Sequence, residues 1–283
     1  MTALLALFVG ALVTAVLLAT TRTVLAQPTL QRQNHRGHEL PTAAGLLLVA
    51  AAVAVEGGHT VMGMLGLGGA DTASARLLVL AAVVAFGFLG LIDDLLGDAD
   101  DRGLRGHLLA AVRGRVTTGF LKLGGGVAVA LVLAGVADGD RPGWVLVDGA
   151  VIALAANLGN LFDRAPGRTL KWALLCYVPL ALVAGTAAAG VALAVVMGAA
   201  IGLLLADLRE ELMLGDTGAN ALGAALGTAV VLSTGEGVRL IVCAVALGLT
   251  LLSEVASFSR IIEAVPPLRA FDRLGRRPVG GER

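Results

Sequence analysis

The stretch Gly87-Phe88-Leu89-Gly90-Leu91-Ile92-Asp93-Asp94 joins the end of a long apolar run to two adjacent carboxylates. The run begins at Leu77, and a basic segment, from Arg102 to Lys122, follows the aspartates. An ionisable residue at a membrane boundary is a functional candidate, because burying charge there is costly. The pair could also be a simple stop signal, although cations usually serve that purpose. Carboxylates with cations nearby suit Mg²⁺ and phosphate chemistry, so Asp93 and Asp94 are our first candidate catalytic residues.

The composition predicts an integral membrane protein. Of the 283 residues, 57% are hydrophobic and only 15% are charged, whereas a soluble domain averages about 25% charged residues. The mean hydropathy is +0.87. Cations are scattered through short segments of an apolar chain, which argues against nucleic-acid binding.

The apolar runs predict an all-α protein with about nine transmembrane helices, since about 20 apolar residues span a bilayer. A small-residue hinge near Gly190 makes eight or ten spans an alternative. We expect one transmembrane domain over residues 1–268 and a basic cytoplasmic tail over 269–283. The nine expected spans are Thr2–Ala26, Thr42–Val55, Leu77–Ile92, Leu123–Ala137, Trp144–Leu158, Trp172–Ala188, Val191–Ala206, Ala219–Ser233 and Val238–Phe258.

The cations predict the orientation of these spans. If the first helix runs from outside to inside, only Arg76, Arg141 and Arg239 of the 21 cations fall in outer loops, which leaves eighteen inside. Such an excess favours an extracytoplasmic N-terminus and a cytoplasmic C-terminus. The chemistry is therefore expected at the cytoplasmic face.

Two basic residues on that face could contact phosphate. Arg36, in Asn34-His35-Arg36-Gly37, lies in a polar segment that is either a plain turn or a phosphate-binding loop. Lys122 stands at the start of the fourth expected helix, where it could bind lipid headgroups or hold a pyrophosphate.

Three further polar patches point to the same face. Asn157, Asn160 and Asp163 recur at a spacing of three, which places them along one face of a helix. Asp216, in Gly215-Asp216-Thr217-Gly218-Ala219-Asn220, is either the N-cap of the eighth helix or a metal ligand flanked by glycine. Glu254 is an ionisable residue near the end of the ninth span and is a functional candidate for that reason.

In this order, the motifs resemble those of the polyprenyl-phosphate N-acetylhexosamine-1-phosphate transferase superfamily. The motifs that carry the resemblance are Gly90-Leu91-Ile92-Asp93-Asp94, the stretch from Asn157 to Gly167, and Gly215-to-Asn220. The resemblance extends from Asn34 to about Arg277. Each motif alone is weak, and their combination on one face is more specific.

The resemblance implies an Mg²⁺-dependent enzyme of the bacterial plasma membrane that makes cell-envelope glycans such as peptidoglycan. Such an enzyme transfers a sugar-1-phosphate from a UDP-N-acetylhexosamine to a polyprenyl phosphate such as undecaprenyl phosphate, and it releases UMP. It is also compatible with a homodimer. The roles implied for this chain are catalysis by Asp93, Asp94 and Asp163, metal binding by Asp216 and Asp163, and substrate binding by Lys122, Asn157, Asn160, Arg36 and Arg269.

The chain departs from the family pattern at two places. Pro166 stands where the family usually carries a second aspartate, and Pro266-Pro267-Leu268-Arg269-Ala270-Phe271-Asp272 replaces a histidine-rich motif. Arg269 and Arg273 could supply pyrophosphate contacts instead. The alternatives are a non-catalytic relative that binds polyprenyl phosphate or scaffolds envelope assembly, and a small-solute transporter, which would need charges near mid-bilayer.

Overall fold

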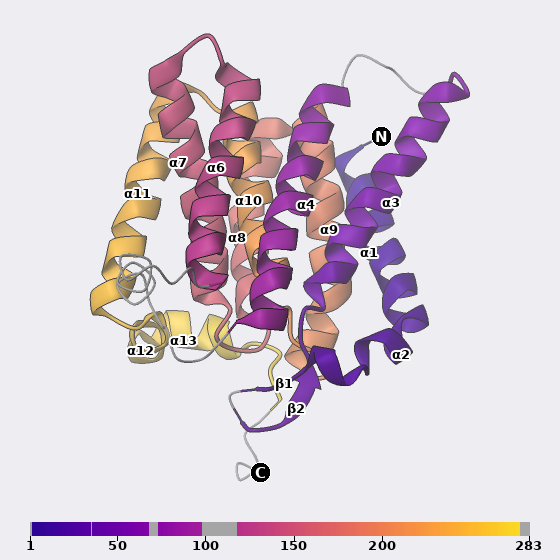
Figure 1. The fold of residues 1–283 in the computed structure, drawn as a ribbon, viewed down its shortest axis with the longest axis vertical. Coiled ribbons are helices and arrows are strands. Elements are labelled where there is room, and N and C mark those ends of the chain that lie inside the picture. The colour runs from indigo at the N-terminus through magenta and orange to yellow at the C-terminus, as the bar shows by residue number, and fades with distance from the viewer. Residues whose placement is uncertain (1, 35, 68–72, 98–117, 278–283) are drawn as a thin grey trace.

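The computed structural model describes residues 2–34, 36–67, 73–97 and 118–277, and shows them as a bundle of long helices with short elements at one end (Figure 1). The basic segment from Arg102 to Arg115 lies outside the described residues. In chain order the described elements are α1 (Ala3–Thr20), α2 (Arg22–Leu25), η1 (Pro28–Leu30), β1 (Gln31–Gln33), β2 (Glu39–Pro41), α3 (Gly45–Met64), α4 (Ala73–Leu96), α6 (Thr118–Asp138), α7 (Pro142–Phe162), α8 (Arg168–Ala184), α9 (Ala188–Leu208), α10 (Gly215–Ser233), α11 (Glu236–Val255), α12 (Phe258–Ala264) and α13 (Pro266–Arg273).

The bundle confirms the predicted all-α membrane fold. In the described part of the chain, seven helices are long and apolar enough to cross a membrane, namely α1, α3, α4, α6, α7, α9 and α11. Helices α8 and α10 run among them (Figure 1). Each of the nine expected apolar runs therefore corresponds to one long helix, although the first run is divided at Thr21 into α1 and the short α2. The number of spans stays a prediction.

The helices extend past the apolar runs into the polar motifs. Helix α4 continues beyond Asp93 and Asp94 to Leu96, because nothing before Gly97 interrupts the helical pattern. Helix α6 begins at Thr118, one turn before Lys122. The candidate residues on α4 and α6 therefore sit on rigid helix ends and not on loops.

Helix α10 occupies the centre of the bundle. Most of its residues are buried, whereas α11 has Ala246 as its one buried residue. Its neighbours approach the α10 backbone through glycine: a Cβ on Gly90 of α4 would lie 2.3 Å from the Asp216 carbonyl oxygen, and one on Gly159 of α7 would lie 2.2 Å from that of Ala219. Small residues permit such close helix contacts in membranes.

The start of α10 is also fixed from the other side by the segment that precedes α3. The Met213 N–H donates to the Pro41 carbonyl at 2.7 Å, and the Gly45 N–H donates to the Leu214 carbonyl at 2.9 Å. Ala43, between them, has φ +57° in the left-handed region that costs a non-glycine residue energy. This strained residue lies between the two hydrogen bonds that join the start of α3 to the start of α10.

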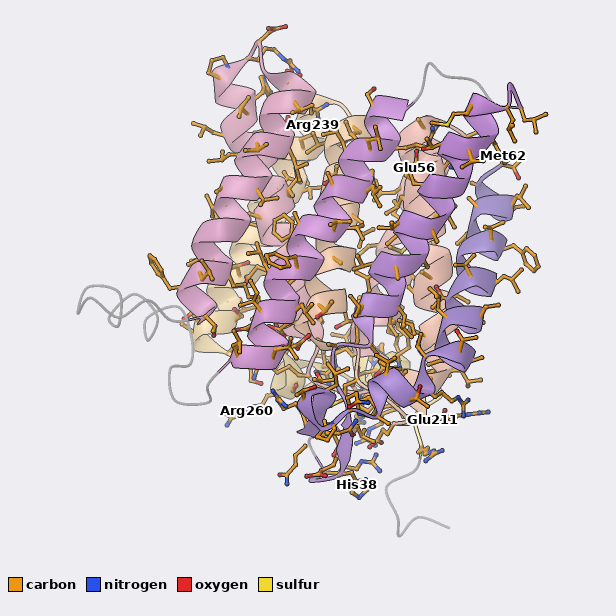
Figure 2. All side chains as sticks on the ribbon, turned by 45° about the vertical axis from the view of Figure 1, so that its right-hand side comes forward. His38, Glu56, Met62, Glu211, Arg239 and Arg260 are labelled. Atoms are coloured by element: carbon orange, nitrogen blue, oxygen red, sulfur yellow. The ribbon has the colours of Figure 1, made fainter. Side chains whose placement is uncertain are left out.

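The two ends of the bundle carry different short elements. The hairpin end carries the antiparallel pair β1–β2, with Arg32 opposite Leu40, together with α12 and α13. The opposite end carries the connection between α6 and α7. Figure 2 shows His38, Glu211 and Arg260 at the hairpin end, and Glu56, Met62 and Arg239 at the opposite end.

The C-terminal region is more ordered than a free tail. The boundary expected between residues 268 and 269 falls inside α13. Asp272 of that helix is 3% exposed, so residues 269–273 are part of the folded bundle end. The tail prediction is corrected for these residues, because the sequence gives no sign of the buried partners that α13 finds.

Candidate functional site

The first functional cluster joins α4, α6 and α10 at the hairpin end. The Lys122 ammonium of α6 lies 3.3 Å from Asp93 Oδ2 of α4 and also pairs with Asp216 Oδ2 of α10. All three side chains are half-buried. A single cation thus bridges two carboxylates that are 123 residues apart in the sequence, at Asp93 and Asp216.

Asp94 holds the start of α10 and does not face this ammonium directly. Its Oδ1 accepts the Asp216 N–H at 2.9 Å. Its Oδ2 accepts the Thr217 N–H at 2.9 Å and the Thr217 hydroxyl at 2.6 Å. The first N–H groups of a helix have no partner within the helix and carry partial positive charge, so the Asp94 carboxylate caps α10 from a neighbouring helix.

This arrangement leaves the Asp216 carboxylate free of the capping role. The residue at the N-cap position is Leu214, and no side chain of the α10 segment caps it. Gly215 has φ +71°, and a Cβ there would lie 2.7 Å from Asp94 Oδ2. A glycine is therefore needed at this position, and the alternative of Asp216 as an N-cap residue is wrong.

Asn160 joins the cluster from α7. Its Nδ2 donates to Asp216 Oδ2 at 3.0 Å. Asn157, one turn earlier, donates instead to the Thr250 hydroxyl of α11 at 3.3 Å. The structure thus brings Asn160 to the candidate metal ligand and directs Asn157 to a helix–helix contact.

Asp163 lies beyond the end of α7, which closes at Phe162. The three polar residues of this motif therefore do not share one helix face as expected, because the third is a C-cap residue. Burial raises the pKa of Asp163 well above its usual value, and the negative charges of Asp207, Asp216 and Asp94 raise that pKa further. A bound cation would favour the charged form.

Asp207 was missed from the sequence. It is buried near the end of α9, and its Oδ2 accepts the Gly167 N–H at 2.8 Å. The available signal was the one used for Asp93, namely a carboxylate directly after a long apolar run. Asp207 adds to the negative charge around Asp163.

The donor set fits Mg²⁺ only together with a substrate. Among the residues that the structure describes, no group of three or more His, Cys, Asp or Glu could hold a metal ion alone. Mg²⁺ is commonly bound by one or two carboxylates, with substrate phosphates and waters completing the octahedron. Asp216 is the candidate for one such carboxylate, and Lys122 pairs with both Asp216 and Asp93.

The other two predicted binding residues lie elsewhere. Arg36, in the turn between β1 and β2, pairs at 3.0 Å with Glu210, which lies between α9 and α10. Arg269 of α13 donates to the Glu263 carbonyl at 3.5 Å. The described contacts of Arg36 and Arg269 link them to the surface of the hairpin end and not to Lys122 or Asp216.

A cavity opens at the end of the helix that carries Asn160. It has a volume of about 250 Å³ and lies between the end of α7 and the junction of α11 with α12. Arg164, the neighbour of Asp163, and Glu254 line it together with three hydroxyl groups, those of Ser253, Ser257 and Ser259. Such a lining of charges and hydroxyls suits a polar, hydrogen-bonding ligand.

Comparison with known proteins finds two curated relatives of this chain. The chain is 33% identical over 178 residues to a phospho-N-acetylmuramoyl-pentapeptide-transferase of Desulforudis audaxviator, a match that covers 56% of this chain and 53% of the relative. It is 28% identical over 174 residues to the protein of the same name from Desulforamulus reducens. This match covers 56% of this chain and 52% of that relative. No protein-family model matches the chain. The chain spans about half the length of the curated relatives it matches, and the matches confirm its resemblance to the polyprenyl-phosphate hexosamine-1-phosphate transferase superfamily.

Proposed function

We propose that this membrane protein is a transferase that moves a sugar-1-phosphate from a UDP-sugar to a polyprenyl phosphate in cell-envelope glycan synthesis. One observation carries the proposal: Lys122 bridges Asp93 and Asp216, with Asn160 on the same carboxylate, at one end of a membrane bundle. The two relatives named as transferases support the same reaction class. The donor is proposed to be a UDP-N-acetylhexosamine and the acceptor undecaprenyl phosphate.

In the proposed reaction, an oxygen of the lipid phosphate attacks the β-phosphorus of the UDP-sugar. A new phosphorus–oxygen bond forms, the bond from that phosphorus to the bridging oxygen breaks, and UMP leaves with the electron pair. The lipid phosphate is largely ionised at neutral pH, so a strong general base is not needed. Positioning and charge neutralisation then carry most of the catalysis.

The chain's own residues divide these tasks. Lys122 would bind a substrate phosphate, and Asp93 would orient that ammonium. Asp216 and Asp163 would hold Mg²⁺, which supplies neutralisation of the pyrophosphate charge when bound. Asn160 would keep the Asp216 carboxylate directed toward the metal, and Asp94 would fix the helix that carries it.

The setting of the reaction follows from the same end of the molecule. The described cations gather mostly at the hairpin end, so we propose that this end faces the cytoplasm, where a nucleotide sugar is available. The cavity beside Arg164 and Glu254 is the proposed place for the hydroxyl groups of the donor sugar. The membrane of a bacterium is the proposed location.

The test is UMP release by purified protein with Mg²⁺, undecaprenyl phosphate and a panel of UDP-sugars. We expect release that requires Mg²⁺ and disappears in Asp93→Asn. Silence with every donor, together with retained binding of undecaprenyl phosphate, would move the assignment to a non-catalytic lipid-phosphate-binding relative.

A further inference from the structure

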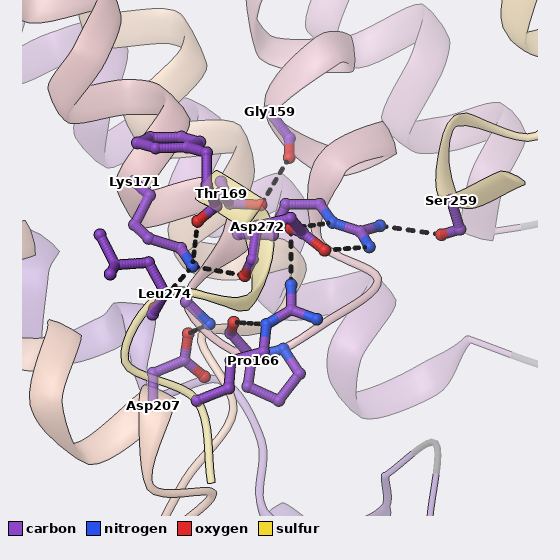
Figure 3. A network of polar contacts seen from close by, with 12 residues as sticks. Gly159, Pro166, Thr169, Lys171, Asp207, Ser259, Asp272 and Leu274 are labelled. Atoms are coloured by element: carbon purple, nitrogen blue, oxygen red, sulfur yellow. Dashed lines mark hydrogen bonds and ion pairs between the residues drawn. The ribbon is translucent and has the colours of Figure 1, made fainter. Parts of the chain in front are cut away.

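We propose that Asp272 is a positioning residue for this reaction: through α13 it holds the segment Asp163–Gly167, and so sets the place of the Asp163 carboxylate. The inference rests on the proposed function, since Asp163 is a candidate metal ligand there. It concerns the region that replaces the family's histidine-rich motif. Figure 3 shows the contacts on which it depends.

The first contact is a buried ion pair between α8 and α13. Arg168 Nε donates to Asp272 Oδ1 at 2.8 Å, and Arg168 Nη2 donates to Asp272 Oδ2 at 2.9 Å. Both side chains are almost fully buried, at 5% and 4% exposed. A two-pronged pair of this kind fixes direction as well as distance. Because Arg168 directly follows Gly167, this pair holds one end of the segment.

The second contact fixes the end of α13 itself. The Lys171 ammonium donates to three backbone carbonyls, those of Phe271 at 3.1 Å, Asp272 at 2.5 Å and Leu274 at 3.0 Å. An ammonium has three donors, so its capacity is filled at this helix end. A cation is also favourable at a helix C-terminus.

The third contact is made by Arg276, which joins the segment to Asp272. Arg276 donates through Nε to the Pro166 carbonyl at 2.9 Å and through Nη2 to Asp272 Oδ1 at 2.6 Å. Gly167 donates its N–H to Asp207. Asp272 therefore binds two arginines, one that follows the segment and one that contacts Pro166 within it (Figure 3).

Aromatic packing continues the connection to the end of α7. The ring of Phe271 meets the ring of Trp172 edge-on, with their centroids 5.3 Å apart. The ring centroids of Trp172 and Phe162 are 5.6 Å apart. Phe162 is the residue before Asp163. Displacement of α13 would therefore disturb both sides of Asp163, and Trp172 would sense it.

The arginines on the exposed side of α13 do not take part. Arg273 pairs with Glu263 and its side chain is 63% exposed. Arg269 also contacts Glu263, through its carbonyl. The replaced motif thus acts on the site through the buried Asp272, and the exposed Glu263 of α12 provides a matched acidic control.

The test compares Asp272→Asn with Glu263→Gln, the same acid-to-amide change in an exposed ion pair, in a Trp144→Phe background where Trp172 is the one remaining tryptophan. Asp272→Asn keeps the shape of the side chain and removes its charge, which leaves Arg168 buried without a counter-ion. Three quantities are measured: hydrogen exchange of residues 163–168, Trp172 emission, and kcat and KM for transfer. Asp272→Glu tests rescue by a retained carboxylate.

We expect Asp272→Asn to speed exchange in residues 163–168, shift Trp172 emission, and lower kcat about 10- to 100-fold with little change in KM, because an ångström of displacement costs about that much. Asp272→Glu should recover part of kcat, and Glu263→Gln should match the parent in all three. Faster exchange with an unchanged kcat, or unchanged exchange, would overturn the proposal. If the parent protein shows no transfer, the proposed function fails, while hydrogen exchange still decides whether α13 holds the segment.

If Asp272→Asn does not fold, Phe271→Leu offers a second route, because it removes the ring contact with Trp172 and leaves the ion pairs. Its expected effects have the same direction and are smaller, within about tenfold in kcat. An unchanged exchange rate in residues 163–168 for this variant counts against the proposal.

Discussion

The two ends of α6 and α7 carry ionic clusters that differ in how their charges are matched. At the opposite end, Arg239 binds Asp138 at 2.5 Å and Asp148 at 3.0 Å, while Arg141 binds Asp138 at 2.7 Å and also Glu236. Two arginines there form ion pairs with three carboxylates. At the hairpin end, one lysine serves Asp93 and Asp216, with two more carboxylates close to Asp216.

The difference teaches what a functional cluster looks like in this protein. The cluster at the opposite end ties α6, α7 and α11 together with its own cations, although the buried Asp148 Oδ1 has no hydrogen-bond partner among the described residues. The hairpin-end cluster has an excess of negative charge, and the pKa of Asp163 is raised by burial and by its neighbours. A cavity is lined by Arg164, the residue that follows Asp163. An unmatched charge next to open space indicates a ligand that carries the missing charge.

The largest expected effect is at Asp216. Asp216→Asn should lower transfer by at least about 100-fold, a typical loss for one electrostatic group in an active site, because it removes a carboxylate proposed to hold Mg²⁺. Its melting temperature should stay close to that of the parent. The measurement is UMP release per folded protein. Full activity in this variant would remove Asp216 from the metal site.

The adjacent aspartates should separate into two roles. Asp93→Asn should lose transfer with little change in stability, because Asp93 contacts Lys122 at the surface of the cluster. Asp94→Ala should lose transfer and also lower the unfolding free energy by about 1–3 kcal/mol, because it leaves donors at the start of α10 without their acceptor. Activity and thermal unfolding of the two variants are compared directly. Equal stability of the two would contradict the capping role of Asp94.

The opposite end should affect stability alone. Arg239→Met leaves the fully buried Asp148 without its cation, while Asp138 keeps Arg141. The change should cost about 3–5 kcal/mol of unfolding free energy. Transfer per folded molecule should be unchanged. Thermal unfolding and UMP release measure the two effects. A loss of transfer by folded Arg239→Met would mean that the comparison between the ends does not separate structure from function.

Lys122 should compete with a metal for Asp216. Lys122→Met should bind Mn²⁺, a spectroscopic substitute for Mg²⁺, a fewfold more tightly, because a cation no longer occupies the carboxylates. The same variant should transfer more slowly, since the substrate phosphate loses its ammonium. Weaker Mn²⁺ binding would show that Lys122 supports the metal site and does not compete with it.

The smallest effect concerns acid stability. Burial alone would raise the pKa of Asp272, but its hydrogen bond from Arg168 and the charges of Arg168 and Arg276 outweigh burial and lower that pKa from its usual 3.8. A carboxyl with a lowered folded-state pKa stabilises the fold above its usual value and loses this contribution as pH falls through the lowered one. The difference in melting temperature between the parent and Asp272→Asn should therefore be constant above about pH 5 and shrink below pH 3.8. A difference that does not depend on pH would contradict the charged pair.

Much of the fold could be predicted from the sequence because each apolar run is long and bounded by polar residues. The pairing of Asp93, Lys122 and Asp216 at one end followed from counting the spans between them. The metal, the nucleotide and the lipid stay predictions. The role of Asp94 could not be predicted, because its three partners lie on a helix more than 120 residues away.

The C-terminal region shows the other limit. Arg269 and Arg273 were the expected anion-binding residues because they are charged and replace the histidines. That role stays a prediction, and the structure adds a residue that the sequence did not single out: Asp272, which resembles an ordinary surface residue, meets Arg168 and Arg276 in the interior. A pattern of residue types cannot tell which side of an eight-residue helix such as α13 packs inward when its partners are 100 residues away.

The close glycine contacts around α10 have a consequence for variation in this protein. Gly90 and Gly159 approach its backbone from two helices, and a Cβ on Gly45 of α3 would lie 2.1 Å from Gly218 Cα. Three neighbours thus leave no room for a side chain at these glycine contacts, although α10 carries larger residues such as Leu222 and Val231 elsewhere. In a library of random substitutions selected for function, these glycines should be the most depleted positions, more so than the charged residues at the opposite end. A search for variants that use other donor sugars therefore has most room away from these contacts.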